Sequence, residues 1–175
     1  NHTYWRDDKE HDWLRNGEEI WEEGYETDLL EDDAIQKLKH RDKDRPFLLY
    51  LPFGAGHLPL QAPKEIIDKY THVEDEKRRN YSAMIDAMDQ AIGRVLKVLD
   101  DEGLREDTLV VFFSDNGGAE GNGGADNGAF RGRKGTVYEG GTRVPAVLRW
   151  PGVLPAGKKS RQVVSAMDWF PTLAA

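Results

Sequence analysis

The sequence predicts an α/β domain built on a mostly parallel sheet flanked by helices. Two short runs, "FLLYLPF" at 47–53 and "TLVVFF" at 108–113, are apolar without alternation, which is typical of strands buried on both faces. Between them, apolar residues recur at three- and four-residue spacing over 80–101, which indicates a long amphipathic helix. Strand, helix and strand in this order favour a parallel α/β architecture.

The first 45 residues are the most charged part of the chain and hold few aliphatic clusters. Within them, Asn16-Gly17 is the strongest short turn signal, and it predicts a hairpin that joins 13–14 to 20–21. The turn that closes such a hairpin needs positive φ angles, which asparagine and glycine tolerate best.

Helix boundaries are predicted from caps and breakers. Asp28 and Glu31 have the spacing of a capping box, with aspartate in place of serine or threonine, and predict a helix over 32–40. A shorter helix is expected over 64–70. Gly103 suits the C-terminal stop of the long helix.

The C-terminal part of the chain begins with a glycine-rich loop over 114–141. Further strands are expected near 144–150 and 162–165, and a helix is expected to open at Asp168. No internal repeat or low-complexity tract interrupts this order.

Polar side chains follow both predicted core strands. Asp115 and Asn116 come directly after 108–113, and His57 lies in the turn after 47–53. Ligands of parallel α/β sheets bind beyond the carboxyl ends of the strands, so we expect these three residues on the same rim. Carboxylate and amide oxygens suit a hard divalent cation, and imidazole can protonate a leaving group. Taken singly, an Asp-Asn-Gly turn also fits a plain turn, and a lone histidine also fits a structural role.

A basic segment, "RGRKGTVYEGGTRVP", stands out in an acidic chain. Its cations suit sulfate or phosphate oxygens, and its glycines let the backbone approach an anion closely. A solvated basic loop is the other interpretation, with Glu139 pairing one of the charges to hold the loop. The cations are Arg131, Arg133, Lys134 and Arg143.

Composition excludes several classes of protein. The net charge of −8 disfavours a general nucleic-acid binder, and mean hydropathy of −0.70 argues against a membrane protein. The absence of cysteine excludes disulfides and thiolate metal sites. The chain starts without Met or a signal peptide and stops in the first turns of a helix, so we interpret it as an internal piece of a longer protein. A complete small protein with frayed ends is the other interpretation.

Taken together and in order, the motifs resemble one family. "GHLPLQAP", "FFSDNGG", "FRGRKGTVYEGGTRVPAVLRWPG" and "DWFPTLAA" are similar to the C-terminal part of the catalytic domain of formylglycine-dependent sulfatases, in the arylsulfatase group that includes arylsulfatase B-like enzymes. The resemblance implies that 1–175 is a fragment of one catalytic domain with an alkaline-phosphatase-like fold. It also implies calcium-dependent hydrolysis of an aryl or glycan sulfate ester through a formylglycine nucleophile.

The resemblance assigns roles residue by residue. Asp115 and Asn116 match the second pair of calcium ligands, Lys134 matches the lysine that contacts the sulfate group and the ester oxygen, and His57 matches the histidine beside the leaving-group oxygen. These roles make Lys134 and His57 both substrate-binding and catalytic. Two further motif positions, at 139 and 143, are interpreted as loop scaffolding.

The chain departs from the family pattern in one large respect. The nucleophile motif, a Cys or Ser followed by Pro-Ser-Arg, is absent, and so is the family's first aspartate pair. Both motifs lie earlier in the family's chain, so the nucleophile and the remaining ligands of the one calcium ion are expected outside this fragment. The fragment alone is therefore predicted to be inactive and to bind calcium poorly.

Two alternatives remain open from the sequence. One is a phosphodiesterase or phosphonate monoester hydrolase of the same superfamily, and the other is a non-catalytic homologue that binds sulfated glycans. By family analogy, the partner is a sulfated small molecule or glycan, and the location is extracytoplasmic: secreted, periplasmic or lysosomal. The N-glycosylation pattern occurs at Asn1-His2-Thr3 and Asn80-Tyr81-Ser82, a weak signal.

Overall fold

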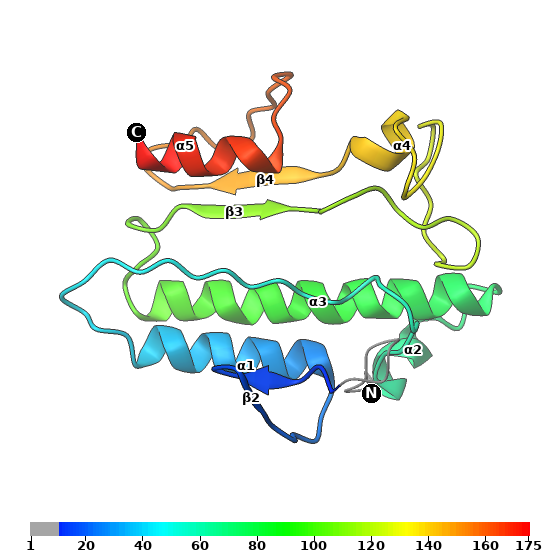
Figure 1. Ribbon diagram of the computed structural model, residues 1–175, viewed down its shortest axis with the longest axis horizontal. Helices are drawn as coiled ribbons and strands as arrows, with labels where there is room; N and C mark the ends of the chain where they lie inside the picture. The colour runs from blue at the N-terminus through cyan, green and yellow to red at the C-terminus, as the bar shows by residue number, and fades with distance from the viewer. Residues whose placement is uncertain (1–10) are drawn as a thin grey trace. The chain divides into compact units, whose positions relative to one another are not determined.

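The structure, a computed structural model, describes residues 11–175 (Figure 1). The glycosylation pattern at Asn1 therefore lies outside the described residues. The chain divides into two compact units. The first takes in the chain up to Glu102 together with 119–126, and the second takes in 103–118 together with 127–175.

Two helices form the core of the first unit. Helix α1 (Glu26–Lys39) packs along α3 (Glu76–Asp101), as Figure 1 shows. Most of the buried side chains of α3 lie on the predicted apolar face, because that face meets α1. Met88, Ile92 and Leu96, predicted on the same face, are only half-buried. The buried apolar residues of the two helices are Ala34, Leu38, Ala83, Met84, Ala87, Ala91, Val95, Val98 and Leu99.

The long helix is confirmed, and its cap explains its true start. Asp75 is the N-cap, and its carboxylate accepts a hydrogen bond from the backbone N–H of Arg78 at 2.7 Å. The helix therefore begins at Glu76, earlier than the apolar pattern alone predicts. Gly103, with φ of +71°, follows its C-terminal end as expected.

The predicted capping box at Asp28 is wrong. Helix α1 begins at Glu26, and its N-cap Tyr25 makes no side-chain cap hydrogen bond. The acidic side chains of the first turn instead suit the positive end of the helix dipole. Glu31 is buried and forms a two-pronged ion pair with Arg94 of α3, so its carboxylate serves packing between helices rather than capping.

The short elements of the first unit follow the sequence closely. Strands β1 (Leu14–Arg15) and β2 (Glu18–Glu19) form the predicted hairpin, with φ of +54° and +86° at the two central turn residues. The predicted helix at 64–70 is present as α2 (Lys64–Ile67) followed by a 3₁₀ turn, η1 (Asp68–Tyr70).

The second unit holds a two-stranded sheet. Strand β3 (Val110–Phe113) pairs with β4 (Ala146–Arg149) in antiparallel register, Val110 opposite Arg149. A short helix, α4 (Glu139–Thr142), precedes β4. The predicted C-terminal helix is present as η2 (Ala166–Asp168) and α5 (Trp169–Ala174).

The predicted strands at 47–53 and 162–165 are not strands, and the strands that do form within 11–175 pair antiparallel. Leu48, Tyr50 and Val163 are 90%, 80% and 94% exposed, so no sheet neighbour among residues 11–175 covers these side chains. An unalternating apolar run predicts burial on both faces, but it does not identify the segments that would supply the neighbours. No helix in the described part of the chain has the length and apolar character that crossing a bilayer requires.

Candidate functional site

The turn after β3 is held by side-chain and backbone hydrogen bonds. The Ser114 hydroxyl donates to the carbonyl of Asn116 at 3.0 Å, and the N–H of Gly117 donates to the carbonyl of Gly141 at 3.0 Å. The amide of Asn116 donates to the carboxylate of Asp115. The exposed Asp115 and half-buried Asn116 therefore present their remaining oxygens together from one rigid turn.

Three buried glycines join this turn to α4. A Cβ atom built on Gly117 would lie 1.8 Å from the carbonyl oxygen of Gly140. One built on Gly140 would lie 2.0 Å from the carbonyl oxygen of Gly132, and one on Gly141 would lie 2.1 Å from that of Thr136. No side chain fits at these distances, so glycine is required here for close backbone approach.

Two of the four cationic side chains in the basic segment bind neighbouring residues of the second unit. Arg131 donates to the hydroxyl of Tyr138 at 2.9 Å and its guanidinium lies 3.9 Å from the centre of that ring. Arg143 donates to the carboxylate of Glu139 at 2.8 Å and lies 4.9 Å from the Phe130 ring centre. The predicted pairing of Glu139 is thus confirmed, and both arginines hold the loop.

Lys134 differs from these arginines. Its side chain is exposed, and its ammonium makes no hydrogen bond or ion pair with any described residue. Its backbone N–H nevertheless donates to the carbonyl of Gly118 at 3.1 Å, which ties the loop to the turn that carries Asp115 and Asn116. A fixed backbone with an uncommitted cation is the arrangement expected of a group that meets an anion from outside.

Asn127 is a residue of this site that sequence reasoning missed. Its Oδ1 accepts from the N–H of Gly118 at 2.8 Å, and its Nδ2 donates to the carbonyl of Gly118 at 3.0 Å and to that of Gly132 at 3.4 Å. Local sequence does not distinguish it, because Asn122 and Asn127 are both followed by glycine in the same loop. Asn122 instead accepts from the ammonium of Lys77 at the surface.

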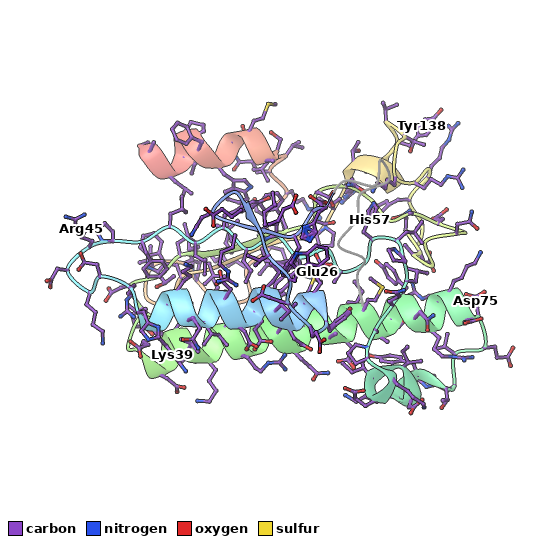
Figure 2. The ribbon with its side chains drawn as sticks, turned by 60° about the horizontal axis from the view of Figure 1, so that its bottom comes forward. Glu26, Lys39, Arg45, His57, Asp75 and Tyr138 are labelled. Atoms are coloured by element: carbon purple, nitrogen blue, oxygen red, sulfur yellow. The ribbon has the colours of Figure 1, made fainter. Side chains whose placement is uncertain are left out.

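His57 lies in the first unit. The N–H of His57 donates to the carbonyl of Gly54 at 3.0 Å, and a Cβ on Gly54 would lie 2.6 Å from a carboxylate oxygen of Glu26. Figure 2 labels His57 and Glu26, the first residue of α1. Nδ1 of His57 lies 2.9 Å from the carbonyl of Leu58, which can only accept, so this bond requires the proton on Nδ1 and leaves Nε2 as the acceptor of the neutral ring.

Asp115 and Asn116 fit part of a calcium shell by their donor chemistry. Calcium takes about 6–8 oxygens, including carboxylates and side-chain carbonyls. The hydrogen bond within the pair uses the Asn116 nitrogen, so the amide oxygen and carboxylate lone pairs remain for a cation. Over residues 11–175 no three His, Cys, Asp or Glu side chains gather where they could hold a metal ion, so this pair is an incomplete set.

The sequence matches the Sulfatase family model over residues 1–175. The chain belongs to the sulfatase family. This sulfatase chain is 38% identical to a sulfatase of Formosa agariphila over 92% of its own length and 32% of that protein. It is 35% identical to mouse arylsulfatase J, with 85% and 25% covered, and 40% identical to mouse steryl-sulfatase, with 85% and 24% covered. The chain thus spans about a third or less of the length of these curated relatives.

Solved structures agree with this family. The sulfatase chain superimposes on Ps i-CgsB in complex with k-i-k-neocarrahexaose with a TM-score of 0.87 at 39% identity, covering 91% of this chain and 35% of that one. A putative sulfatase of Bacteroides fragilis, at 23% identity, matches in fold with a TM-score of 0.72, covering 99% of this chain and 41% of that one. The predicted alkaline-phosphatase-like α/β fold is confirmed, as a partial domain.

The structure therefore groups three of the four predicted site residues. Asp115, Asn116 and Lys134 lie in the second unit, and Gly118 connects the two loops that carry them. His57 lies in the first unit.

Proposed function

We propose that this sulfatase chain is part of an enzyme that hydrolyses an aryl or glycan sulfate ester, with a calcium ion and with a formylglycine nucleophile supplied by sequence outside 1–175. The observation that carries the proposal is the uncommitted ammonium of Lys134 on a backbone fixed to the Asp115-Asn116 turn. Family membership over the whole chain and the oligosaccharide in the Ps i-CgsB complex support a sulfated glycan as one substrate class.

Each side chain has a distinct part in the proposed reaction. Asp115 and Asn116 would hold calcium through their oxygens. When bound, the calcium ion would draw charge from the sulfate oxygens, and the formylglycine would provide the attacking oxygen. Lys134 would stabilise the negative charge that develops on the transferred group and on the ester oxygen.

His57, in its doubly protonated imidazolium form, would donate the Nε2 proton to the leaving oxygen and return to the neutral ring. Its Nδ1–H is directed to the carbonyl of Leu58, so Nε2 is the nitrogen that exchanges a proton with the substrate. Imidazole is suited to this role because its ordinary pKa lies close to neutral pH. Its exposed side chain leaves Nε2 accessible to a leaving group.

The test is a lysine comparison in the full-length protein. Lys134→Ala is expected to lower kcat for a chromogenic aryl sulfate by about 10²- to 10³-fold, the usual effect of removing one such stabilising donor. Lys159→Ala, an exposed lysine of the same unit, is the control and is expected to retain wild-type kcat. Equal activity of both variants contradicts the proposed role. Faster turnover of a phosphodiester or phosphonate than of any sulfate ester favours the phosphate-directed alternative.

A further inference from the structure

We propose that Asn127 is a positioning residue of the sulfatase site, which sets the spacing between the Asp115-Asn116 turn and Lys134. The inference rests on the proposed function for its catalytic consequence. Its structural part, that one carboxamide fixes two loops to each other, rests only on the contacts of the second unit.

The Asn127 side chain pairs with both backbone polar groups of a single residue, Gly118. Its carboxamide oxygen accepts from the N–H of Gly118, and its nitrogen donates to the carbonyl of the same residue, at 2.8 and 3.0 Å. A carboxamide carries an acceptor oxygen beside an NH2 group with two donor hydrogens, so it satisfies both backbone groups of Gly118 at once. Aspartate lacks the donor, and alanine lacks both.

The backbone carbonyl of Gly118 is an acceptor shared by two donors. The carbonyl of Gly118 receives two donors, Nδ2 of Asn127 and the backbone N–H of Lys134. Gly118 also lies directly after Gly117, whose buried position fixes the end of the turn that begins at Asp115. A shift of Gly118 therefore moves the backbone of Lys134 relative to the two proposed calcium ligands.

Asn127 also contacts the loop that carries Lys134. Nδ2 of Asn127 also reaches the carbonyl of Gly132, at 3.4 Å, within the basic segment. The carboxamide thus touches the turn after β3 on one side and the loop of Lys134 on the other. Misplacement of a catalytic group by about 1 Å can cost roughly 10²-fold in rate, so a residue that sets this spacing acts on catalysis without touching substrate.

Asn127→Asp and Asn122→Asp in the full-length protein form a matched pair. Both change an asparagine before a glycine into aspartate, but the Asn122 side chain accepts its hydrogen bond from the surface ammonium of Lys77 and not from either loop of the site. For Asn127→Asp we expect kcat for an aryl sulfate to fall at least tenfold with KM changed less than threefold, and the calcium concentration for half-maximal activity to rise. Asn122→Asp is expected to stay within twofold of wild type in all three quantities.

Hydrogen–deuterium exchange gives a readout that does not depend on activity. In Asn127→Asp, exchange is expected to accelerate in peptides covering 114–119 and 131–136 and to stay unchanged in α3. Accelerated exchange with unchanged kcat assigns Asn127 a merely structural role and overturns the proposal. Unchanged exchange at 114–119 overturns it as well. If the wild-type protein hydrolyses no sulfate ester, the proposed function fails, and the exchange result alone decides whether Asn127 fixes the two loops.

Discussion

Gly140→Ala is the substitution that most directly tests whether the site depends on close backbone packing. The three atoms nearest to a Cβ on Gly140 are backbone atoms of Gly132 and Arg131, at 2.0, 2.6 and 2.9 Å. Ordinary contact begins at 3.4 Å, so the shortest of these distances must grow by 1.4 Å. No flexible side chain can move aside, and the main chain of one loop has to shift.

The energetic cost follows from this displacement. A shift of that size also breaks the hydrogen bond from the N–H of Gly140 to the carbonyl of Arg131, now 2.8 Å long. Overpacking costs about 1–3 kcal/mol, and a lost hydrogen bond costs roughly 1 kcal/mol more. We therefore expect about 3 kcal/mol of local destabilisation. The same shift displaces Lys134, so kcat/KM for an aryl sulfate is expected to fall about 10²-fold.

Gly93→Ala is the matched control. Gly93 is exposed on α3, and a Cβ there meets nothing within 4 Å. Alanine at such a helix position stabilises by about 0.5–1 kcal/mol, because glycine has the poorer helix propensity. Thermal unfolding and kcat/KM of the full-length variants are measured side by side. If Gly140→Ala retains wild-type kcat/KM and melting temperature, the glycine packing has no part in the site and the reasoning fails.

Two further predictions concern the first unit. Glu31→Gln is expected to lower the free energy of unfolding by about 1–3 kcal/mol in urea titrations, less than for a fully buried pair because Arg94 is about half exposed. Asp68→Asn, in the exposed pair with Lys64, is its control, and an equal effect of the two variants contradicts a special role for the buried carboxylate. Burial raises the pKa of Tyr25, so the folded state holds this proton more tightly than the unfolded chain does, and stability should fall as the pH rises above about 10. Tyr25→Phe is expected to flatten that fall while Tyr50→Phe, at an exposed position, leaves it in place; identical alkaline profiles for both variants refute this sign.

The helices were the most predictable part of the fold, because one buried face leaves a periodic trace in the sequence. The pattern of α3 identified most of its buried side chains, and Asn16-Gly17 identified the first hairpin. The start of α1 was missed for a physical reason. Glu31 has the spacing of a capping residue but is paired with Arg94, a partner far away in sequence that no local pattern reveals.

The sheet was predicted less well than the helices. The apolar run at 108–113 does contain β3, whereas the similar run at 47–53 forms no strand in the structure. Hydrophobicity reports the burial that a segment requires, and strand formation also needs a hydrogen-bonding neighbour. The antiparallel pairing of β3 with β4 comes from the return of the chain through α4, a path that the pattern of strands and helices did not predict.

Some residues of the site can be predicted from local sequence, and others become important only through contacts between segments. Asp115, Asn116 and Lys134 carry chemistry that residue type and motif order predict. Asn127 carries none of its own, and its importance arises because it pairs with Gly118, which also holds the backbone of Lys134. A motif therefore predicts which side chains act. The Asn127 carboxamide and the buried glycines determine whether those side chains lie at the distances that catalysis requires. Variants at 127 and 140 should therefore lower kcat, as Lys134→Ala does, while every proposed catalytic side chain remains in place.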